Sequence, residues 1–250
     1  MVLLQTVPTS QVFPTNSQLK LESGRVIRYV AAEGANPRKE TRVFYDELPV
    51  AMSTDRRRSN GCQEYDDWEG VNALCQVIDT ITEIEMETEL FDNKSVLEIG
   101  FATGLPATLA MECGASEVTV HCPNKLNMDE YIRPTLKGNL IASNRMKMSC
   151  GEIIDFSPRG KKYDVILAPE ILNSPSENYP AIHNMIDEAL TDDGICFLTS
   201  RLTYFNGSGS LPEFLNYVKT QKKLEHLVRW TSQPCDIVPR QVIQLTRTIF

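Results

Sequence analysis

Several features that would reveal a function directly are missing from this sequence. The seven cysteines are an odd number and lie scattered, and no two of them form a C-x-x-C pair, so we expect neither a disulfide framework nor a metal site. None of the three histidines, His121, His183 and His226, stands in a pattern typical of catalysis, and we interpret them as structural. No segment is long and apolar enough to span a bilayer.

Targeting signals and a surplus of positive charge are absent too. The opening residues, MVLLQTVPTS, contain neither the basic region nor the apolar stretch of a signal peptide. Together with the scattered cysteines, this predicts a cytoplasmic or nuclear protein, or one found in both compartments. The net charge of −8 argues against nonspecific nucleic-acid binding by bulk electrostatics. We therefore expect no direct nucleic-acid partner and no membrane partner.

What is present is typical of a soluble α/β protein. The 250 residues are 42% hydrophobic and 23% charged, enough for one domain with a large core and an N-terminal extension. We predict an N-terminal arm over residues 1–60, partly flexible, and a main domain over residues 61–250. Within the arm we expect a tail to about residue 24, a β-hairpin from strands 25–30 and 41–48, and a solvated polar loop over 53–61.

The main domain is organised around residues 95–109, SVLEIGFATGLPATL. A short apolar strand carrying Glu98 leads into a glycine turn, and a helix follows with Pro106 in its first turn, where a missing N–H costs least. Strand, glycine turn and helix N-terminus form the layout that binds nucleotide-like ligands, because the backbone approaches closely and free N–H groups face an electron-rich partner. The predicted cofactor-binding residues of this stretch are Glu98, Gly100, Phe101, Ala102, Thr103 and Gly104.

The turn also discriminates between ligands. It lacks the G-x-G-x-x-G pattern of dinucleotide-binding folds and the Lys that follows the last glycine of a phosphate loop. An acid two residues before the first glycine, and another glycine four residues after it, resemble the first motif of the seven-strand S-adenosylmethionine methyltransferases. A plain strand–helix turn in another α/β protein is the alternative.

The remaining pattern alternates strands with helices. An amphipathic helix over 68–85 precedes the first strand, and the chain ends in a pair of strands over 225–231 and 241–246. This predicts a doubly wound sheet with an antiparallel edge. Between these ends we expect strands at 117–121, 146–150, 162–168 and 195–200, helices at 105–112, 128–144, 179–190 and 211–223, and an exit turn at 192–194.

Ligands bind outside the carboxyl ends of parallel strands, so the residues after each strand are candidates. After the second strand, where an acid would hold a ribose hydroxyl, stand Cys122, Pro123 and Asn124. Gly151–Glu152 follows the third strand and is predicted to contact an adenine. The fourth strand ends at Ala168, and we expect Glu170 and Asn173 to face a reaction chamber.

Several positions together resemble one family, the histidine protein methyltransferases that modify a large-subunit ribosomal protein. The matching stretches are Trp68–Glu69, residues 96–105, Asn124 with Asp129–Glu130, Gly151–Glu152, residues 163–167, Glu170 with Ile171 and Asn173, residues 200–209 and residues 238–245. The resemblance implies a Rossmann-like seven-strand sheet, S-adenosylmethionine as cofactor and a protein substrate, ribosomal in the family. It adds Trp68, Cys122, Asn124 and Ala168 to the cofactor side, and it assigns Tyr204, Phe205 and Gly207 to a substrate channel.

Four departures from the family pattern stand out. Ala102 replaces a middle glycine, Cys122 an acid, Ile153 a tryptophan and Arg201 a lysine. A charged hydrogen bond contributes roughly 1.5–3 kcal/mol, so the lost acid weakens cofactor binding about ten- to a hundredfold unless another group compensates.

The activity that the resemblance implies is attack of an imidazole nitrogen on the methyl group of S-adenosylmethionine. Glu170 or Asn173 would accept the other ring N–H, and positioning and exclusion of water would supply most of the catalysis. Two alternatives remain open at this point. One is a non-catalytic binding module on the same fold, suggested by Ala102 and Cys122. The other is a methyltransferase for lysine or a small molecule, because the fold does not fix the substrate.

Overall fold

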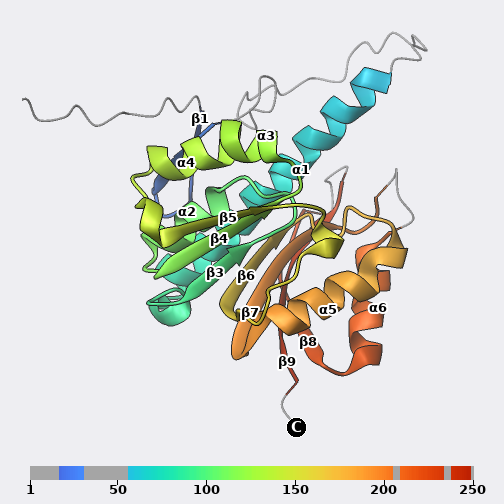
Figure 1. The fold of residues 1–250 in the computed structure, drawn as a ribbon. Helices are drawn as coiled ribbons and strands as arrows, with labels where there is room; N and C mark the ends of the chain where they lie inside the picture. The colour runs from blue at the N-terminus through green and yellow to red at the C-terminus, as the bar shows by residue number, and fades with distance from the viewer. Residues whose placement is uncertain (1–16, 31–55, 205–208, 234–237, 249–250) are drawn as a thin grey trace, which may run out of the picture.

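A computed structural model describes residues 17–30, 56–204, 209–233 and 238–248, with side chains described from Trp68 onward in the first helix. Seven strands form one sheet in the order β5-β4-β3-β6-β7-β9-β8, and a separate hairpin pairs β1 with β2 (Figure 1). The strands are β1 (Ser17–Lys20), β2 (Val26–Tyr29), β3 (Ser95–Glu98), β4 (Glu117–Cys122), β5 (Met146–Cys150), β6 (Tyr163–Pro169), β7 (Leu190–Arg201), β8 (Leu224–Thr231) and β9 (Arg240–Arg247). The helices are α1 (Arg56–Asp79), α2 (Leu105–Glu112), α3 (Lys125–Asn127), α4 (Arg133–Gly138), α5 (Tyr179–Ala189) and α6 (Leu211–Gln221).

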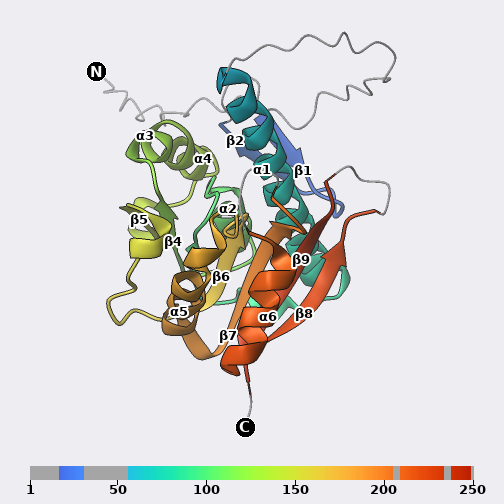
Figure 2. The same ribbon diagram turned by 90° about the vertical axis from the view of Figure 1, so that its right-hand side faces the viewer.

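Helices cover both faces of the sheet, so it is doubly wound as predicted (Figure 2). Successive residues of the central strand serve opposite faces: Val96 packs with α1, α2 and the hairpin, whereas Leu97 packs with α5 and α6. Strands β5, β4, β3, β6 and β7 are parallel, and β9 runs antiparallel between β7 and β8. The expected antiparallel edge is confirmed.

The chain reverses its direction of travel across the sheet beside β3. After β3 it moves outward through β4 to β5, and it then returns to β6 on the other side of β3. The strand order therefore switches between β3 and β6, and the carboxyl ends of these two strands frame a crevice of the kind in which open α/β sheets bind ligands.

The N-terminal arm differs from the prediction. Residues 17–24, expected within a tail, form β1 and its turn, and β1 pairs with β2 from Ser17↔Tyr29 to Lys20↔Val26. Leu19 and Ile27 are buried in the core, which gives so short a hairpin its stability. The strand expected at 41–48 lies outside the described residues. The division into an arm and a main domain remains a prediction.

Three other boundaries are corrected. The expected polar loop over 53–61 gives way to helix at Arg56, where α1 begins. The helix expected over 128–144 ends at Gly138, because Leu140 takes a left-handed φ of 61° and a 3₁₀ turn, Ser143–Arg145, follows. The expected exit turn at 192–194 lies inside β7, where the pairing with β6 shifts register between Tyr163 and Val165.

Candidate functional site

Glu98, at the end of β3, holds the glycine turn through hydrogen bonds to its backbone. Its carboxylate is completely buried: Oε1 accepts the N–H groups of Thr103 at 2.7 Å and Gly104 at 2.9 Å, and Oε2 accepts that of Ala107 at 2.9 Å. Burial raises the pKa of Glu98 to about 6, against the lowering effect of these three donors. Glu98 therefore acts as the cap of α2.

This capping corrects the expectation that the amides at the start of α2 are free for a ligand. Within the helix Glu98 accepts the N–H of Ala107, and just before it the N–H groups of Thr103 and Gly104. The Thr103 hydroxyl accepts the N–H of Leu105 at 3.3 Å, and Pro106 has none. The first turn of α2 is thus satisfied within the chain. A ligand at this turn would meet the outer surface of the backbone at Gly100 and Phe101.

Gly100 fastens the turn to the end of β6. Its φ is +109°, and a Cβ here would lie 2.4 Å from the carbonyl oxygen of Pro169. The N–H of Phe101 donates to the same carbonyl at 2.7 Å. Ala102 lies outside the left-handed region, so the backbone conformation does not require the family's middle glycine at this position.

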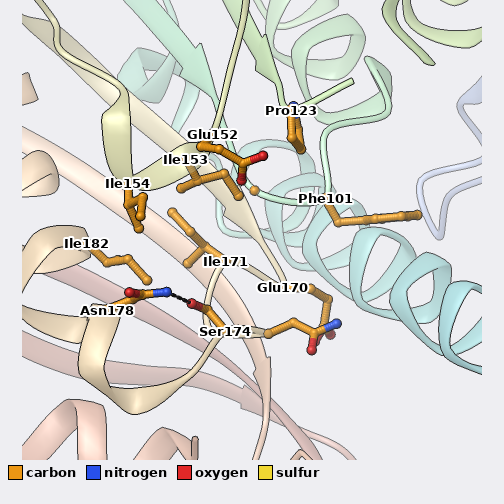
Figure 3. A pocket seen from close by; sticks show the side chains of 12 residues that line it. Phe101, Pro123, Glu152, Ile153, Ile154, Glu170, Ile171, Ser174, Asn178 and Ile182 are labelled. Atoms are coloured by element: carbon orange, nitrogen blue, oxygen red, sulfur yellow. Dashed lines mark hydrogen bonds between the residues drawn. The ribbon is translucent and has the colours of Figure 1, made fainter. Parts of the chain in front are cut away.

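A cavity of about 260 Å³ opens at the strand switch, between the ends of β3, β4, β5 and β6 and the start of α5 (Figure 3). It is lined by Gly100, Phe101, Pro123, Glu152, Ile153, Ile154, Glu170, Ile171, Asn173, Ser174, Asn178 and Ile182. The wall is largely apolar. Figure 3 shows Glu152 beside Ile153 and Pro123, whereas the ring of Phe101 extends away toward α1. An apolar, pre-formed crevice with a few polar groups is typical of a small-molecule site.

The loop after β4 uses its polar groups internally. The Cys122 thiol is buried and donates to the Asn124 carbonyl at 3.1 Å, and burial raises its pKa. The Asn124 side chain accepts the Leu126 N–H at 2.8 Å and so caps α3. Gly151 donates its N–H to the Cys122 carbonyl at 3.2 Å. Glu152, by contrast, is exposed and contributes a carboxylate to the cavity lining.

Glu170 belongs to an ionic cluster that we call the Glu170 cluster, made of Glu69, Glu170, Arg201, Tyr204 and Arg240 and buried except at Glu69. The Glu170 side chain is 0% exposed; its Oε1 accepts Arg240 Nε at 3.1 Å and its Oε2 accepts the Tyr204 hydroxyl at 2.7 Å. Arg240 also donates to Glu69 at 2.7 Å, and Arg201 Nε lies 4.0 Å from Glu170. Burial raises the pKa of Glu170, opposed by Arg240, Tyr204 and Arg201.

An aromatic stack joins the hairpin to the glycine turn. The ring centroids of Tyr29 and Trp68 are 5.2 Å apart, and Trp68 meets Phe101 edge to face at 5.8 Å. Trp68 is 5% exposed, and its Nε1 has no hydrogen-bond partner among the described residues. Trp68 therefore lies behind the turn, one ring away from the cavity.

The structure brings only some of the predicted residues to the cavity. Its lining includes Gly100, Phe101, Glu152, Glu170 and Asn173. It does not include Trp68, Glu98, Ala102, Thr103, Gly104, Cys122, Asn124, Gly151 and Ala168, among which Asn124 is exposed. Tyr204 lies in the Glu170 cluster, and Phe205 and Gly207 lie outside the described residues.

Sequence reasoning missed the contribution of α5 to the cavity. Asn178 donates to the Ser174 hydroxyl at 2.7 Å, and Ile182 follows one helical turn later. Only the packing of α5 against the sheet brings these residues to the cavity, and no local pattern marks them. Among the described residues, no cluster of three potential metal ligands occurs and no helix is long and apolar enough to cross a membrane.

Comparison with known proteins gives a full-length relative and more distant ones. A scan against models of protein families finds no match. The chain is 43% identical over 251 residues to the "uncharacterized protein F22B7.9" of Caenorhabditis elegans, covering 99% of this chain and all of the relative. It is 29% identical to the "histidine protein methyltransferase 1 homolog" of Dictyostelium discoideum, over 69% of this chain and 56% of that protein. The bovine homolog of the same name is 23% identical over 54% of this chain and 44% of its own length. This chain thus spans about half of each histidine methyltransferase homolog.

Solved structures share the fold. A TehB-like SAM-dependent methyltransferase from Corynebacterium glutamicum superposes with a TM-score of 0.53 at 12% identity, over 77% of this chain and 98% of its own. The [4+2]-cyclase SpnF also reaches 0.53, at 14% identity over 69% of this chain and 82% of its own. The chain therefore belongs to one family with the C. elegans protein F22B7.9, and it is a divergent relative of the histidine protein methyltransferases on the Rossmann-like methyltransferase fold.

Proposed function

We propose that this protein is an S-adenosylmethionine-dependent methyltransferase that N-methylates a histidine side chain of a protein substrate. The observation that carries the proposal is the cavity at the strand switch, bounded by the Gly100 turn and by residues that follow β4, β5 and β6. The distant likeness to the Dictyostelium and bovine histidine methyltransferase homologs supports the substrate class.

The cavity residues fit an adenosyl group. Ile153, Ile154 and Ile171 offer apolar surface to a purine ring, and Gly100 lets the backbone approach closely. Cys122 and Asn124 form hydrogen bonds within their own loop. Glu152 is therefore the group that would accept hydrogen bonds from the N–H and O–H donors of the adenosyl group. When bound, the cofactor supplies an electrophilic methyl group on a positively charged sulfur.

The chain's own part in the reaction is positioning. An imidazole is largely neutral at pH 7, so one ring nitrogen carries a lone pair once the other holds the proton. Asn173 lies half-buried in the cavity lining, and its carboxamide oxygen would accept that N–H and fix the tautomer. We assign Glu170 no direct contact with the imidazole, because its carboxylate is fully buried and paired. Tyr204, with Phe205 and Gly207 beyond the described residues, is the proposed lining of the substrate channel.

Two measurements test this function. The protein is titrated calorimetrically with S-adenosylmethionine and then incubated with the labelled cofactor and a cell lysate, and the modified residue is located by mass spectrometry. Heat of binding and label on a histidine are expected. Label on lysine would overturn the substrate class, and absence of binding at millimolar cofactor would overturn the proposal as a whole.

An Asn173→Ala variant separates the role of Asn173 in methyl transfer from cofactor binding. It removes the proposed acceptor and leaves the apolar wall intact, so cofactor affinity should stay within about threefold while transfer falls at least ~tenfold. Equal transfer by the variant would remove Asn173 from the mechanism.

A second function, a non-catalytic binding module, is favoured by one observation: the position of the family's ribose-binding acid is filled by the buried Cys122 thiol. Cofactor binding without any labelled product, in a lysate whose proteins have not been methylated beforehand, would favour this module over the enzyme.

A further inference from the structure

The main chain at Glu170 adopts a conformation that its side chain disfavours. Its φ is +49°, in the left-handed region where a residue with a Cβ is strained. The strain persists because the neighbouring backbone is fixed: the Glu170 N–H donates to Thr199 on β7 at 3.0 Å, and its carbonyl accepts the Asn173 N–H at 3.0 Å. Strained residues held in this way concentrate at functional sites.

The facing helix makes room for the Glu170 carboxylate. Gly70 lies inside α1, where glycine lowers helix stability relative to alanine. A Cβ at Gly70 would lie 2.1 Å from Glu170 Oε1, so any larger residue would collide with the carboxylate. A second local preference is thus violated at the same contact.

The burial of charge is a third cost at this place. Glu170 is buried with Arg201 and Arg240, and each of these arginines is only about one-twentieth exposed. Well-packed apolar residues would stabilise a core as well as a buried ion pair or better, so such a cluster is poorly explained by stability alone. Sequences violate several local rules at one place mainly where function requires it.

The position of the cluster indicates what it does. Directly after Glu170 the main chain supplies Ile171, Asn173 and Ser174 to the cavity wall, while the carboxylate holds Tyr204, where the predicted substrate channel begins. Arg240 extends the connection to Glu69 on α1. One buried carboxylate therefore links the cofactor side of the cavity to the elements expected on the substrate side.

We propose that Glu170 is a positioning residue that fixes Asn173 relative to Tyr204, and so aligns the acceptor side chain for methyl transfer. The inference rests on the proposed function and deepens it: Glu170 governs alignment of the acceptor and contributes little to cofactor affinity. Tyr204 and Arg240 of the cluster, and Gly70 on the facing helix, serve the same alignment.

The test compares Glu170→Gln with the double variant Glu170→Gln/Arg240→Gln, and uses Asp187→Asn as control. Asp187 also pairs with an arginine, Arg247, but this pair joins α5 to β9 outside the cavity lining. For each protein, cofactor affinity, kcat, KM and the urea midpoint of unfolding are measured with the identified protein substrate. The single variant leaves the cluster with more positive than negative side chains, Arg201 and Arg240 against Glu69, and the double variant restores the balance.

We expect Glu170→Gln to bind cofactor within about threefold of the wild type and to lose at least ~tenfold in kcat. The double variant should unfold at a higher urea midpoint than Glu170→Gln, but its kcat should stay as low. Asp187→Asn should have the kcat of the wild type. A double variant that recovers both, or a kcat of Glu170→Gln within twofold of wild type, would show that the cluster is only structural.

Tyr204→Phe keeps the proposal testable if both Glu170 variants fail to fold. It removes only the hydroxyl that donates to Glu170, so a lower kcat at unchanged cofactor affinity supports the inference, and an unchanged kcat overturns it. A wild-type protein without transfer would overturn the proposed function together with this inference. Wild-type transfer with unaffected variants would overturn the inference alone.

Discussion

Gly100 is a residue at which the turn after β3 lies close to the end of β6. A Cβ there would press against the Pro169 carbonyl, and its φ of +109° is open only to glycine. We therefore expect Gly100→Ala to destabilise the protein by at least ~2 kcal/mol and to abolish cofactor binding, as judged by urea unfolding and calorimetric titration.

Gly24 offers a matched control for this substitution. Its φ is +90°, but a Cβ at this position meets nothing within 4 Å. Gly24→Ala should therefore cost only the backbone penalty, about 1 kcal/mol, and leave cofactor binding unchanged. If the two variants behaved alike, the close approach to Pro169 would have no role in the site.

Glu98 makes the stability of the protein depend on pH. Its pKa is raised to about 6 in the folded state from an ordinary value of 4.5, so the folded protein binds the proton more tightly than the unfolded chain. The associated stability is present below pH 4.5 and is lost as the pH rises to 6. Because one pKa unit corresponds to about 1.4 kcal/mol, the free energy of unfolding should fall by roughly 2 kcal/mol in total, from pH well below 4.5 to pH well above 6.

The matched variant Glu98→Gln isolates this effect. It lacks the titrating group, so the difference in unfolding free energy between wild type and variant should narrow between pH 4.5 and 7, measured with urea at each pH. A constant difference would mean that the pKa of Glu98 is the same in both states. The variant should also be less stable than the wild type throughout, since an amide cannot accept all three backbone N–H groups.

Among the elements, the β1–β2 hairpin is joined to α1 by a buried acid in addition to the apolar burial of Leu19 and Ile27. Asp79, at the end of α1, accepts the Ser23 N–H at 2.9 Å and the Ser23 hydroxyl at 2.7 Å. A double-mutant cycle of Ser23→Ala and Asp79→Ala should give a coupling free energy of about 2 kcal/mol, as expected for hydrogen bonds to a charged group.

The same turn contains a weaker link that serves as control. Gln76 accepts the Glu22 N–H and donates to the Lys20 carbonyl, but these bonds are neutral and exposed. Gln76→Ala should cost under ~1 kcal/mol in the same unfolding assay. A coupling near zero between Ser23 and Asp79 would assign the docking of the hairpin to the Tyr29–Trp68 stack instead.

Predictability from sequence varied between elements for physical reasons. Strand β6 carries a long apolar run that belongs to the buried centre of a parallel sheet, and it was found at nearly the right bounds. Of β7 only the second half was found, because its apolar run begins at Ile195 and the polar residues before it resemble a turn. Strand β1 has four residues and a single alternation around Leu19, a signal too short to distinguish from a tail. The helix after β4 is broken by a π turn, Met128–Ile132, which no local pattern marked.

The candidate site likewise has parts that the sequence predicts and parts that it does not. The glycine turn and the strand ends could be located, because a motif and the polarity of a parallel sheet fix where they lie. The partners of Glu98 could not be foreseen, since they depend on the folded path of the turn. The contact of Gly70 with Glu170 joins residues 100 positions apart and exists only because α1 packs against the sheet near β6 and β7.

At the scale of the whole molecule, the cavity lies at the strand switch between β3 and β6. A ligand in it would therefore contact the loops that follow β3, β4, β5 and β6. Binding there should stabilise the entire fold by mass action, by about 2.7 kcal/mol at a ligand concentration one hundred times Kd. For a chain of this size that amounts to roughly 5–10 °C in the thermal midpoint.

We therefore expect the midpoint of the wild type to rise with the concentration of S-adenosylmethionine or S-adenosylhomocysteine, measured by scanning calorimetry. Asp187→Asn, altered outside the cavity lining, should show the same rise, whereas Gly100→Ala should show none. In the proposed site Cys122 stands where the family has an acid, so we expect Glu152 to be the carboxylate that contacts the ligand. Glu152→Gln should then require about tenfold more ligand for the same rise in midpoint. A Glu152→Gln variant with the wild-type dependence would mean that the ligand is held by the backbone and the apolar wall alone.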